Sequence, residues 1–246
     1  MLQVCLNGAR DRGECRTLPV TADELAAEAK RAVAAGAEDI HLHPKDADGH
    51  DSLAPGPVAE AVTAVRAVVP KEVQIGVTTG AWAVPGPQQR AELIRSWSVL
   101  PDHASVNWHE EGAETVAAVL MARGIGVEAG IYSGTEAARR FLASPLSARV
   151  LRVLAEVTDT DPRTAEATAA HLLKELGDDL TAPVLLHGEE GGAWPVLRAA
   201  ARLGLDSRIG LEDVLVLPDG STPADNAALV RAARSLLRRG QASESR

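Results

Sequence analysis

The chain has 246 residues, a formal net charge of −9 and a hydrophobic content of 46% with only 2% aromatic residues, so its core must consist mainly of Ala, Val, Leu and Ile. The acidic balance excludes the basic face that a nucleic-acid-binding protein offers to phosphates, and no apolar run approaches the roughly 18 residues of a membrane span. Because Cys5 and Cys15 are too few for a disulfide framework and the N-terminus has no signal-peptide pattern, we expect free thiols and a cytoplasmic protein.

Short apolar segments alternate with amphipathic ones along the whole chain. The apolar segments, which we predict to be strands, cover residues 2–6, 39–43, 73–77, 104–107, 126–132, 150–157, 183–187 and 208–212. The helices are predicted over residues 21–36, 57–68, 87–97, 114–123, from 134 onward, 161–177, 191–204 and 223–240. Thr21 and Glu24 have the spacing of a capping box, which marks the start of the first helix. Residues 238–246 are polar, and we expect them to form a disordered tail.

This alternation predicts the fold class. Strands that are short and apolar throughout are typical of parallel strands buried on both faces. Eight βα units in roughly 250 residues are the signature of an α/β protein with a single-domain (β/α)8 barrel, or TIM barrel, which we expect to span residues 1–246. A doubly wound sheet is the alternative, but it usually contains fewer units. In a barrel of this kind the active site lies at the carboxyl ends of the strands.

The second predicted strand ends in His41-Leu42-His43 and is followed by Pro44. Side chains alternate faces along a strand, so His41 and His43 point to the same side. Two imidazoles at this spacing can share one metal ion. The pair is short, however, and also occurs by chance as one core histidine and one histidine at a strand end.

Polar residues gather at the carboxyl ends of seven of the eight predicted strands, where a barrel interior otherwise prefers Val, Ile and Leu. Besides His41 and His43, they are Thr78, Thr79, Asn107, His109, Glu128, Tyr132, Glu156, His187, Glu189, Glu190, Glu212 and Asp213. One such residue would mean little, but a ring from seven strands is hard to explain by packing. The ring therefore predicts a polar active site.

Glu212 is the candidate for a third metal ligand. In a closed barrel the second and eighth strands both neighbour the first, so they lie about 10 Å apart. Arg208 and Glu212 are four residues apart on the eighth predicted strand and therefore share a face. A carboxylate beside two histidines gives three ligands and an open position, the pattern of a catalytic zinc site. The other interpretation of Glu212 is a salt bridge to Arg208, although an inward Glu beside two histidines is costly without a cation.

Several segments together match one known family. They are Asn7-Gly8-Ala9, Leu18-Pro19-Val20-Thr21, Ala34-Ala35-Gly36-Ala37, His41-Leu42-His43, Asp46, Asp48-Gly49, Thr78-Thr79-Gly80, Ala104-Ser105-Val106-Asn107, Arg208-Ile209-Gly210-Leu211-Glu212-Asp213 and Asn226-Ala227-Ala228-Leu229-Val230. In these segments the chain resembles the β-keto acid cleavage enzymes, also described as 3-keto-5-aminohexanoate cleavage enzymes. The match extends over nearly the whole chain, and the two metal segments in this order are specific where each alone is not.

The resemblance implies one Zn²⁺ per chain, held by His41, His43 and Glu212. It also implies a Claisen-type exchange in which a β-keto acid and acetyl-CoA give acetoacetate and a new acyl-CoA. The metal would polarise the keto and carboxylate oxygens of the substrate and stabilise the developing enolate. Arg208 and Asp213 would form a catalytic pair, in which Arg208 is an electrostatic anchor because a guanidinium stays protonated.

Further residues receive roles in the same scheme. Thr78 would replace the serine of the family as a hydroxyl donor, and Glu128 is assigned to the catalytic group as well. The residues assigned to substrate binding are Thr79, Asn107, His109, His187 and Glu189. We expect the chain to form a homo-oligomer, a dimer or a tetramer, with no nucleic acid or membrane as a partner.

The chain departs from the family pattern in loops that should face the substrate. Arg10 stands where family members commonly carry an acid, and the segments Val157–Asp161 and His187–Gly192 replace a Val-Pro-Gly-Gly loop and a more apolar segment. Both the substrate and the use of CoA depend on these loops. They carry an acidic set, Glu128, Glu156, Glu189 and Glu190. This set predicts a β-keto acid with a cationic far end, the alternative being that loop arginines pair with these acids.

Two other functions stay open from the sequence. One is another metal-dependent lyase or hydrolase acting on a small carboxylate substrate, with Glu189 or Glu190 as general base toward a metal-bound water. The other is a barrel that keeps zinc for structure or binds a small acid without turnover. A structural zinc usually has four protein ligands and only three are evident here, which argues against the last function.

Overall fold

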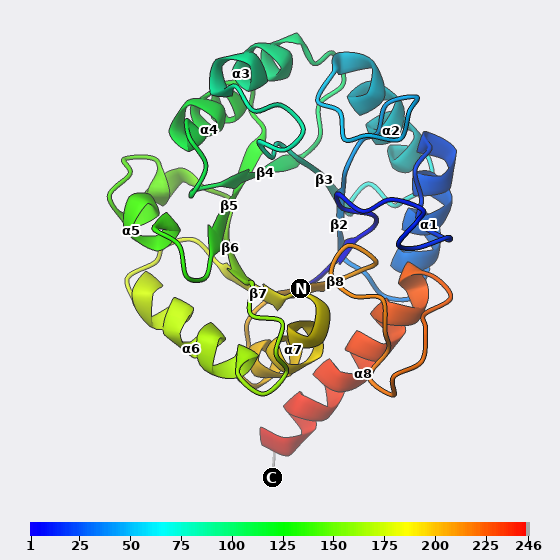
Figure 1. Cartoon of the computed structure of the whole chain (residues 1–246), viewed down its shortest axis with the longest axis vertical. Coiled ribbons are helices and arrows are strands. Elements are labelled where there is room, and N and C mark those ends of the chain that lie inside the picture. The colour runs from blue at the N-terminus through cyan, green and yellow to red at the C-terminus, as the bar shows by residue number, and fades with distance from the viewer. Residues whose placement is uncertain (245–246) are drawn as a thin grey trace.

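The computed structural model describes residues 1–244, with side chains up to Arg238, and shows strands surrounded by a ring of helices (Figure 1). The strands are β1 Leu2–Cys5, β2 Asp39–Leu42, β3 Gln74–Thr78, β4 His103–Asn107, β5 Gly126–Tyr132, β6 Arg152–Val157, β7 Val184–Gly188 and β8 Ser207–Ile209. The helices are α1 Ala22–Ala34, α2 Pro55–Arg66, α3 Pro87–Ser96, α4 Ala113–Ala122, α5 Ala137–Leu142, α6 Ala165–Leu176, α7 Ala193–Arg202 and α8 Asn226–Glu244. Two 3-10 turns cover Ser147–Arg149 and Glu190–Gly192.

The strands form one parallel sheet that curves into a nearly closed barrel. Its order is β7-β6-β5-β4-β3-β2-β1-β8, so β1 separates β2 from β8 as predicted. A single bridge between Leu185 and Asp206 joins β7 to the start of β8, and the Ser207 hydroxyl donates to the Leu186 carbonyl at 2.8 Å. The predicted (β/α)8 barrel is thereby confirmed.

Local signals in the sequence explain where several helices begin. The capping box before α1 is present, because the Thr21 hydroxyl accepts from the Glu24 amide and the Glu24 carboxylate accepts from the Thr21 amide. Helices α2 and α3 begin at Pro55 and Pro87, positions at which the missing N–H of proline leaves no helical hydrogen bond unmade. The element boundaries thus follow ordinary capping chemistry.

The barrel interior carries polar side chains, whereas the outer faces of the strands pack on the helices through Ala, Val, Leu and Ile. Contacts between strands that are not neighbours show which residues point inward. Asp39 of β2 meets Arg152 of β6, and Gln3 of β1 meets Glu128 of β5, which is possible only across the interior. Every second residue of these strands therefore faces the barrel axis.

The eighth strand is shorter than predicted. It ends at Ile209, and residues 210–213 form a turn in which the Asp213 amide donates to the Gly210 carbonyl at 3.0 Å. A Cβ at Gly210 would lie 1.8 Å from the Cys5 carbonyl oxygen, so the chain approaches β1 closely here before it turns. The prediction that Glu212 lies on the strand and shares a face with Arg208 by strand parity was wrong, since Glu212 reaches the barrel from this turn.

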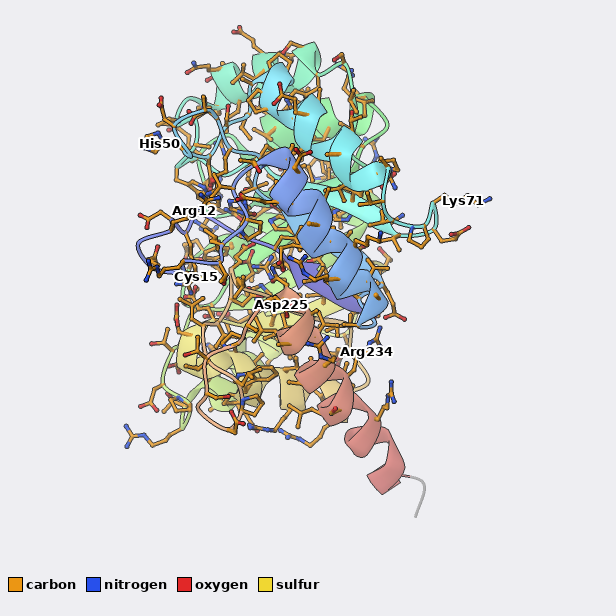
Figure 2. The ribbon with its side chains drawn as sticks, turned by 90° about the vertical axis from the view of Figure 1, so that its right-hand side faces the viewer. Arg12, Cys15, His50, Lys71, Asp225 and Arg234 are labelled. Atoms are coloured by element: carbon orange, nitrogen blue, oxygen red, sulfur yellow. The ribbon has the colours of Figure 1, made fainter. Side chains whose placement is uncertain are left out.

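The last helix also differs from the expectation. It begins at Asn226 and continues past the predicted end at residue 240 to Glu244, because Gly240 is followed by no proline and the residues after it tolerate helix. The predicted disordered tail, residues 238–246, therefore overlaps α8 as far as Glu244, and residues 245–246 lie outside the described residues. Figures 1 and 2 show the end of α8 projecting beyond the barrel.

Over residues 1–244, the structure has no helix with the length and apolar character needed to cross a membrane.

Candidate metal centre and active site

His41, His43 and Glu212 converge at the carboxyl end of the barrel. His41 lies within β2 and His43 directly after it, and both are buried. The Nε2 atom of His41 is 3.8 Å from Glu212 Oε2, and the Nε2 atom of His43 is 3.7 Å from Glu212 Oε1. One ligand atom from each residue lies within 4.8 Å of the others, so the three could hold a metal ion.

The turn after β1 makes room for this arrangement. Gly8 has a φ of +61°, and a Cβ there would lie 2.4 Å from Glu212 Cγ, so only glycine fits beside the carboxylate. The Asn7 side chain fixes the backbone of His43, because its Oδ1 accepts from the His43 amide and its Nδ2 donates to the His43 carbonyl, both at 2.9 Å. Arg10 Nε donates to the Glu212 carbonyl at 3.0 Å. Loop contacts thus hold two of the three residues.

The chemistry of this set fits a divalent metal. His43 Nδ1 lies 2.7 Å from Asp51 Oδ2, an arrangement that leaves Nε2 as the free nitrogen on the side of Glu212. Burial lowers the pKa of His41 to about 3, against the attraction of Glu212, so this imidazole is neutral. Glu212 Oε2 and His41 Nδ1 are buried with no hydrogen-bond partner among the described residues. Two imidazoles and one carboxylate with an open side match a catalytic metal site.

Arg208 and Asp213 lie directly beside the candidate ligand Glu212. The buried Arg208 guanidinium donates to Glu212 Oε1 and to Asp213 Oδ1, both at 2.9 Å. Glu212 thus pairs with Arg208, as one sequence interpretation predicted, and it also faces the two histidines. Burial raises the pKa of Asp213 in spite of this guanidinium, and its Oδ2 has no partner among the described residues. Asp213 can accept a proton at that oxygen.

A second polar group lines the mouth on β4 to β7. The buried His187 lies between Glu156 and Asp213, with its Nε2 3.4 Å from Glu156 Oε2 and its Nδ1 3.6 Å from Asp213 Oδ1. Neither ring nitrogen has a hydrogen-bond partner among the described residues. Burial and the charge of Arg208 lower the pKa of His187 to about 3, whereas burial raises the pKa of Glu156 to about 7. This side of the mouth can hydrogen-bond a substrate.

Asn107 and His109 belong to the same side of the mouth. A Cβ at Gly130 would lie 2.5 Å from Asn107 Oδ1 and 2.8 Å from Glu156 Oε1. Because residue 130 of β5 is a glycine, both side chains have room beside it. Asn107 Nδ2 donates to Glu110 at 2.9 Å, which fixes the orientation of the amide. The His109 ring packs on Tyr132 with the ring centroids 4.4 Å apart.

The two threonines at the end of β3 differ in their availability. The Thr79 hydroxyl donates to the Ser105 carbonyl at 2.6 Å, a contact that ties β3 to β4. The Thr78 hydroxyl accepts from the Gly80 amide at 3.2 Å, and its own proton has no acceptor among the described residues. Of the two, Thr78 is therefore the better hydroxyl donor toward a ligand.

Glu128 is not part of a substrate-facing loop, and the prediction that placed it there was wrong. It is the third residue of β5, fully buried below His41, with its Oε2 3.9 Å from His41 Nδ1. It belongs to a buried cluster that we call the floor, made of Gln3, Asp39, His103, Glu128 and Arg152. Strand parity put Glu128 on the inward face, but it could not tell how deep in the barrel that position lies.

The acidic set that suggested a cationic substrate is partly neutralised inside the chain. Glu128 lies 3.2 Å from His103 and 3.3 Å from Arg152, and Glu190 is ion-paired with Arg10. Burial and two neighbouring acids raise the pKa of Glu189, as burial does for Glu156. The alternative in which loop arginines pair with these acids holds for Glu190 alone, because the partners of Glu128 belong to β4 and β6. The case for a cationic far end of the substrate nevertheless weakens.

Sequence reasoning missed Asp51 and most of the floor. Asp51 lies in the loop after β2, where periodicity carries no information. Gln3, Asp39 and His103 stand at inward positions of apolar strands, and a polar residue at such a position is the signal that could have found them. A further group, Asp46, Asp48 and His50, also has ligand atoms within 4.8 Å of one another, but it is exposed, and Figure 2 shows His50 at the periphery of the barrel.

Comparisons with known proteins agree with this picture. The family model described as beta-keto acid cleavage enzyme matches residues 1–243. The solved complex of ObcA with a C4-CoA adduct and oxalate is similar with a TM-score of 0.71 and 19% identity, over 91% of this chain and 64% of that chain. This chain thus spans slightly less than two thirds of the length of ObcA.

Two further solved structures share the barrel. The type I 3-dehydroquinate dehydratase of Clostridium difficile is similar with a TM-score of 0.66 and 12% identity, over 98% of this chain and 92% of that chain. The dihydrodipicolinate synthase of Agrobacterium tumefaciens gives a TM-score of 0.56 and 15% identity, over 99% and 76%. At these identities the likenesses show the fold alone.

Proposed function

The chain belongs to the beta-keto acid cleavage enzyme family, and from this premise we propose that it is a zinc-dependent enzyme that combines a β-keto acid with acetyl-CoA to give acetoacetate and a new acyl-CoA. The observation that carries the proposal is the convergence of His41, His43 and Glu212 beside the Arg208–Asp213 pair. In this scheme the three converging residues hold one Zn²⁺ per chain. The zinc supplies Lewis-acid polarisation of the keto and carboxylate oxygens of the substrate.

Arg208 supplies a fixed positive charge in the proposed site. It is buried, and its two carboxylate partners hold the guanidinium in one orientation. A preoriented charge in a site of low dielectric constant stabilises negative charge that develops on the substrate without having to reorganise. Arg208 therefore binds the anionic substrate and stabilises the enolate that forms when the carbon–carbon bond is made or broken.

Asp213 is the proton acceptor in the proposed reaction. Its Oδ1 is engaged by Arg208, which leaves Oδ2 for a proton from the carbon between the keto and carboxylate groups. Because burial raises the pKa of Asp213, the proton transfer is less unfavourable than it would be to an ordinary aspartate. In this scheme the Thr78 hydroxyl donates a hydrogen bond to an oxygen of the substrate or of the thioester.

The remaining predicted residues position the substrate and the metal ligands. In this scheme the substrate-binding residues at the ends of β4 and β7 are Asn107, His109, His187 and Glu189. Thr79 supports the backbone there through its hydrogen bond to the Ser105 carbonyl. Glu128 acts through His41, whose Nδ1 faces it, and does not contact the substrate in this scheme. We also propose a cytoplasmic location, which the free thiols of Cys5 and Cys15 support.

The test is a panel of β-keto acids assayed with acetyl-CoA, with and without a zinc chelator. The proposal expects acetoacetate and a new acyl-CoA to appear together in equal amounts, and both to disappear when the metal is removed and return when zinc is restored. Turnover that persists in metal-free protein would contradict the metal assignment. Consumption of the keto acid without any use of acetyl-CoA would contradict the acyl exchange.

A second function is another metal-dependent lyase or hydrolase acting on a small carboxylate substrate. It is favoured by Glu189, an exposed residue directly after β7 whose raised pKa suits a general base. Product analysis without acetyl-CoA separates the two functions, because only the hydrolase or lyase proceeds under those conditions.

A further inference from the structure

Asp51 is a meeting point of three side chains from two loops. Its Oδ2 accepts from His43 Nδ1 and from Trp82 Nε1, each at 2.7 Å, and its Oδ1 lies 2.5 Å from Lys45 Nζ. The Asp51 carboxylate is almost fully buried, so these contacts are made with little competition from water. His43 and Lys45 lie after β2, whereas Trp82 comes from the loop after β3.

Trp82 covers the candidate ligand His43. The two rings are stacked, with centroids 5.8 Å apart and planes inclined by 15°. A Cβ at Gly80 would lie 2.2 Å from the Trp82 indole, so the indole can pack against the backbone there only because residue 80 has no side chain. The hydrogen bond from the indole to Asp51 fixes the ring in this position. Trp82 therefore shields one face of His43 from solvent.

Lys45 connects the same carboxylate to the turn beside Glu212. Its buried ammonium donates to the Gly8 carbonyl at 2.8 Å and to the Arg10 carbonyl at 3.2 Å. Gly8 is the residue that leaves space for the Glu212 side chain. Asp51 thus contacts one candidate ligand directly and is linked through a single lysine to the backbone that accommodates another.

We propose that Asp51 is the positioning residue of the metal centre and that Trp82 completes it as a cover over His43. The inference rests on the metal assignment of the proposed function. A carboxylate on one ring nitrogen of histidine fixes the tautomer and the ring orientation, so that the other nitrogen faces the ion. Asp51 does this for His43, while Lys45 and Trp82 hold Asp51 itself in place.

The test measures zinc affinity in metal-free protein, by competition with a chromophoric chelator, for four proteins. Asp51→Asn should weaken zinc binding about 10–100-fold, the usual effect of losing such a partner. Trp82→Phe keeps an aromatic ring over His43 but loses the N–H, so its effect should be smaller. Asp178→Asn makes the same charge change at an exposed position after α6, outside both groups of possible metal ligands, and it should match the wild type.

Fluorescence gives a readout that a merely structural role for Asp51 would not change. Trp82 is 48% exposed, whereas Trp97, Trp108 and Trp194 are 2%, 1% and 6% exposed, so quenching by acrylamide reports mainly on Trp82. Zinc should change the quenchable emission of the wild type and leave that of Trp82→Phe unchanged. In Asp51→Asn the zinc-free protein should already be quenched more strongly, because a neutral amide oxygen is a weaker acceptor for the indole N–H than the carboxylate.

The outcomes distinguish this inference from the proposed reaction. Asp51→Asn protein with the melting temperature and the zinc affinity of the wild type would overturn the positioning role, as would a wild type that binds no zinc. If Asp51→Asn weakens zinc binding while the wild type turns over no β-keto acid with acetyl-CoA, the reaction is wrong and the positioning role stands.

Discussion

The floor of the barrel and its mouth are both buried polar clusters, but their charged groups are paired within the chain to different degrees. The floor atoms that make no hydrogen bond, His103 Nδ1 and Glu128 Oε2, lie 3.2 Å apart as an ion pair. In the floor, Asp39 accepts from Arg152 at 2.7 Å and lies 3.0 Å from His103 Nε2. In the mouth, His187 has two nitrogens, and Glu212 and Asp213 one oxygen each, without a partner among the described residues. The two clusters share the same strands, so burial alone does not separate them.

The pKa values of the histidines shift in opposite senses in the two clusters. Although burial opposes protonation, the charges of Glu128 and Asp39 raise the pKa of His103 in the floor to about 10. In the mouth, burial dominates and lowers the pKa of His41 and of His187 to about 3. The floor therefore holds charges that neutralise one another, whereas the mouth holds neutral imidazoles with free nitrogens. In the mouth, the buried polar atoms without partners leave hydrogen-bonding capacity for a ligand.

The largest expected effect is at the metal ligands. His41→Ala and His43→Ala should each lose the bound metal and reduce turnover to background, because the Lewis acid contributes several kcal/mol to transition-state stabilisation. The fold should persist, since the histidines make few bonds within the chain. Elemental analysis, circular dichroism and the acetyl-CoA assay measure the three quantities. A variant that retains its metal in full would remove the residue from the ligand set.

The next largest effect should come from removing the buried arginine of the floor. Arg152→Met leaves Asp39 and Glu128 without their guanidinium, and breaking a buried ion pair in this way lowers the free energy of unfolding by about 3–5 kcal/mol. The control is Arg202→Met, which breaks the exposed pair of Arg202 with Glu166 and should lower it by at most about 1 kcal/mol. Urea unfolding followed by circular dichroism measures both. Equal losses would show that the floor is not a stabilising cluster.

Arg208 should affect turnover more than metal content. Arg208→Lys keeps the charge but cannot bridge Glu212 and Asp213 with one planar group, so turnover should fall on the order of 10²-fold, the scale of losing one preoriented donor. Zinc content should stay at one ion per chain. Steady-state kinetics and elemental analysis on the same preparation measure the two, and unchanged turnover would exclude Arg208 from the mechanism.

The floor also predicts how stability depends on pH. The pKa of His103 is raised from 6.5 to about 10, so its contribution to stability is complete below pH 6.5 and is lost as the pH rises through 10. The pKa values of Asp39 and Glu128 are lowered from 3.8 and 4.5, so their contributions are present above those values and are lost in acid. The melting temperature should therefore fall between pH 6.5 and 10, and it should fall less in His103→Gln. Parallel curves for the two proteins would contradict the assignment.

The smallest effect should be at His187, in the mouth. His187→Leu removes a buried imidazole that has no partner, so the melting temperature should stay equal or rise. The KM for the β-keto acid should rise by up to about 10-fold, the value of one hydrogen bond to the substrate. His103→Leu is the matched change in the floor and should lower the melting temperature. A similar loss of stability at both positions would erase the contrast between floor and mouth.

Local rules were enough to predict the fold and two of the three candidate ligands. The spacing of apolar residues predicts the alternation of eight strands and eight helices. His41 and His43 share a face because side chains on a strand alternate between its two faces. Glu212 required two further facts, the order of strands around the barrel and the family resemblance. Its true location on a turn after Ile209 depends on how closely Gly210 approaches Cys5, a contact that periodicity does not report.

The parts that the sequence did not predict are contacts between distant segments. The floor joins residues of β1, β2, β4, β5 and β6, and each of them looks like an isolated polar residue in an apolar strand until the barrel closes. Asp51 lies in an irregular loop, and its role depends on Trp82 reaching across from another loop. Single-strand patterns show which way a residue points, but not what it meets across the barrel.

The position of β1 between β2 and β8 has a consequence for biosynthesis. The ribosome releases β1 and β2 early and β8 late, so His41 and His43 emerge well before Glu212 can join them. Until then β1 exposes a free edge that can pair with another chain, and the metal centre cannot form. A transcript truncated before the codon for Glu212 would therefore yield a product that both fails to acquire zinc and tends to aggregate.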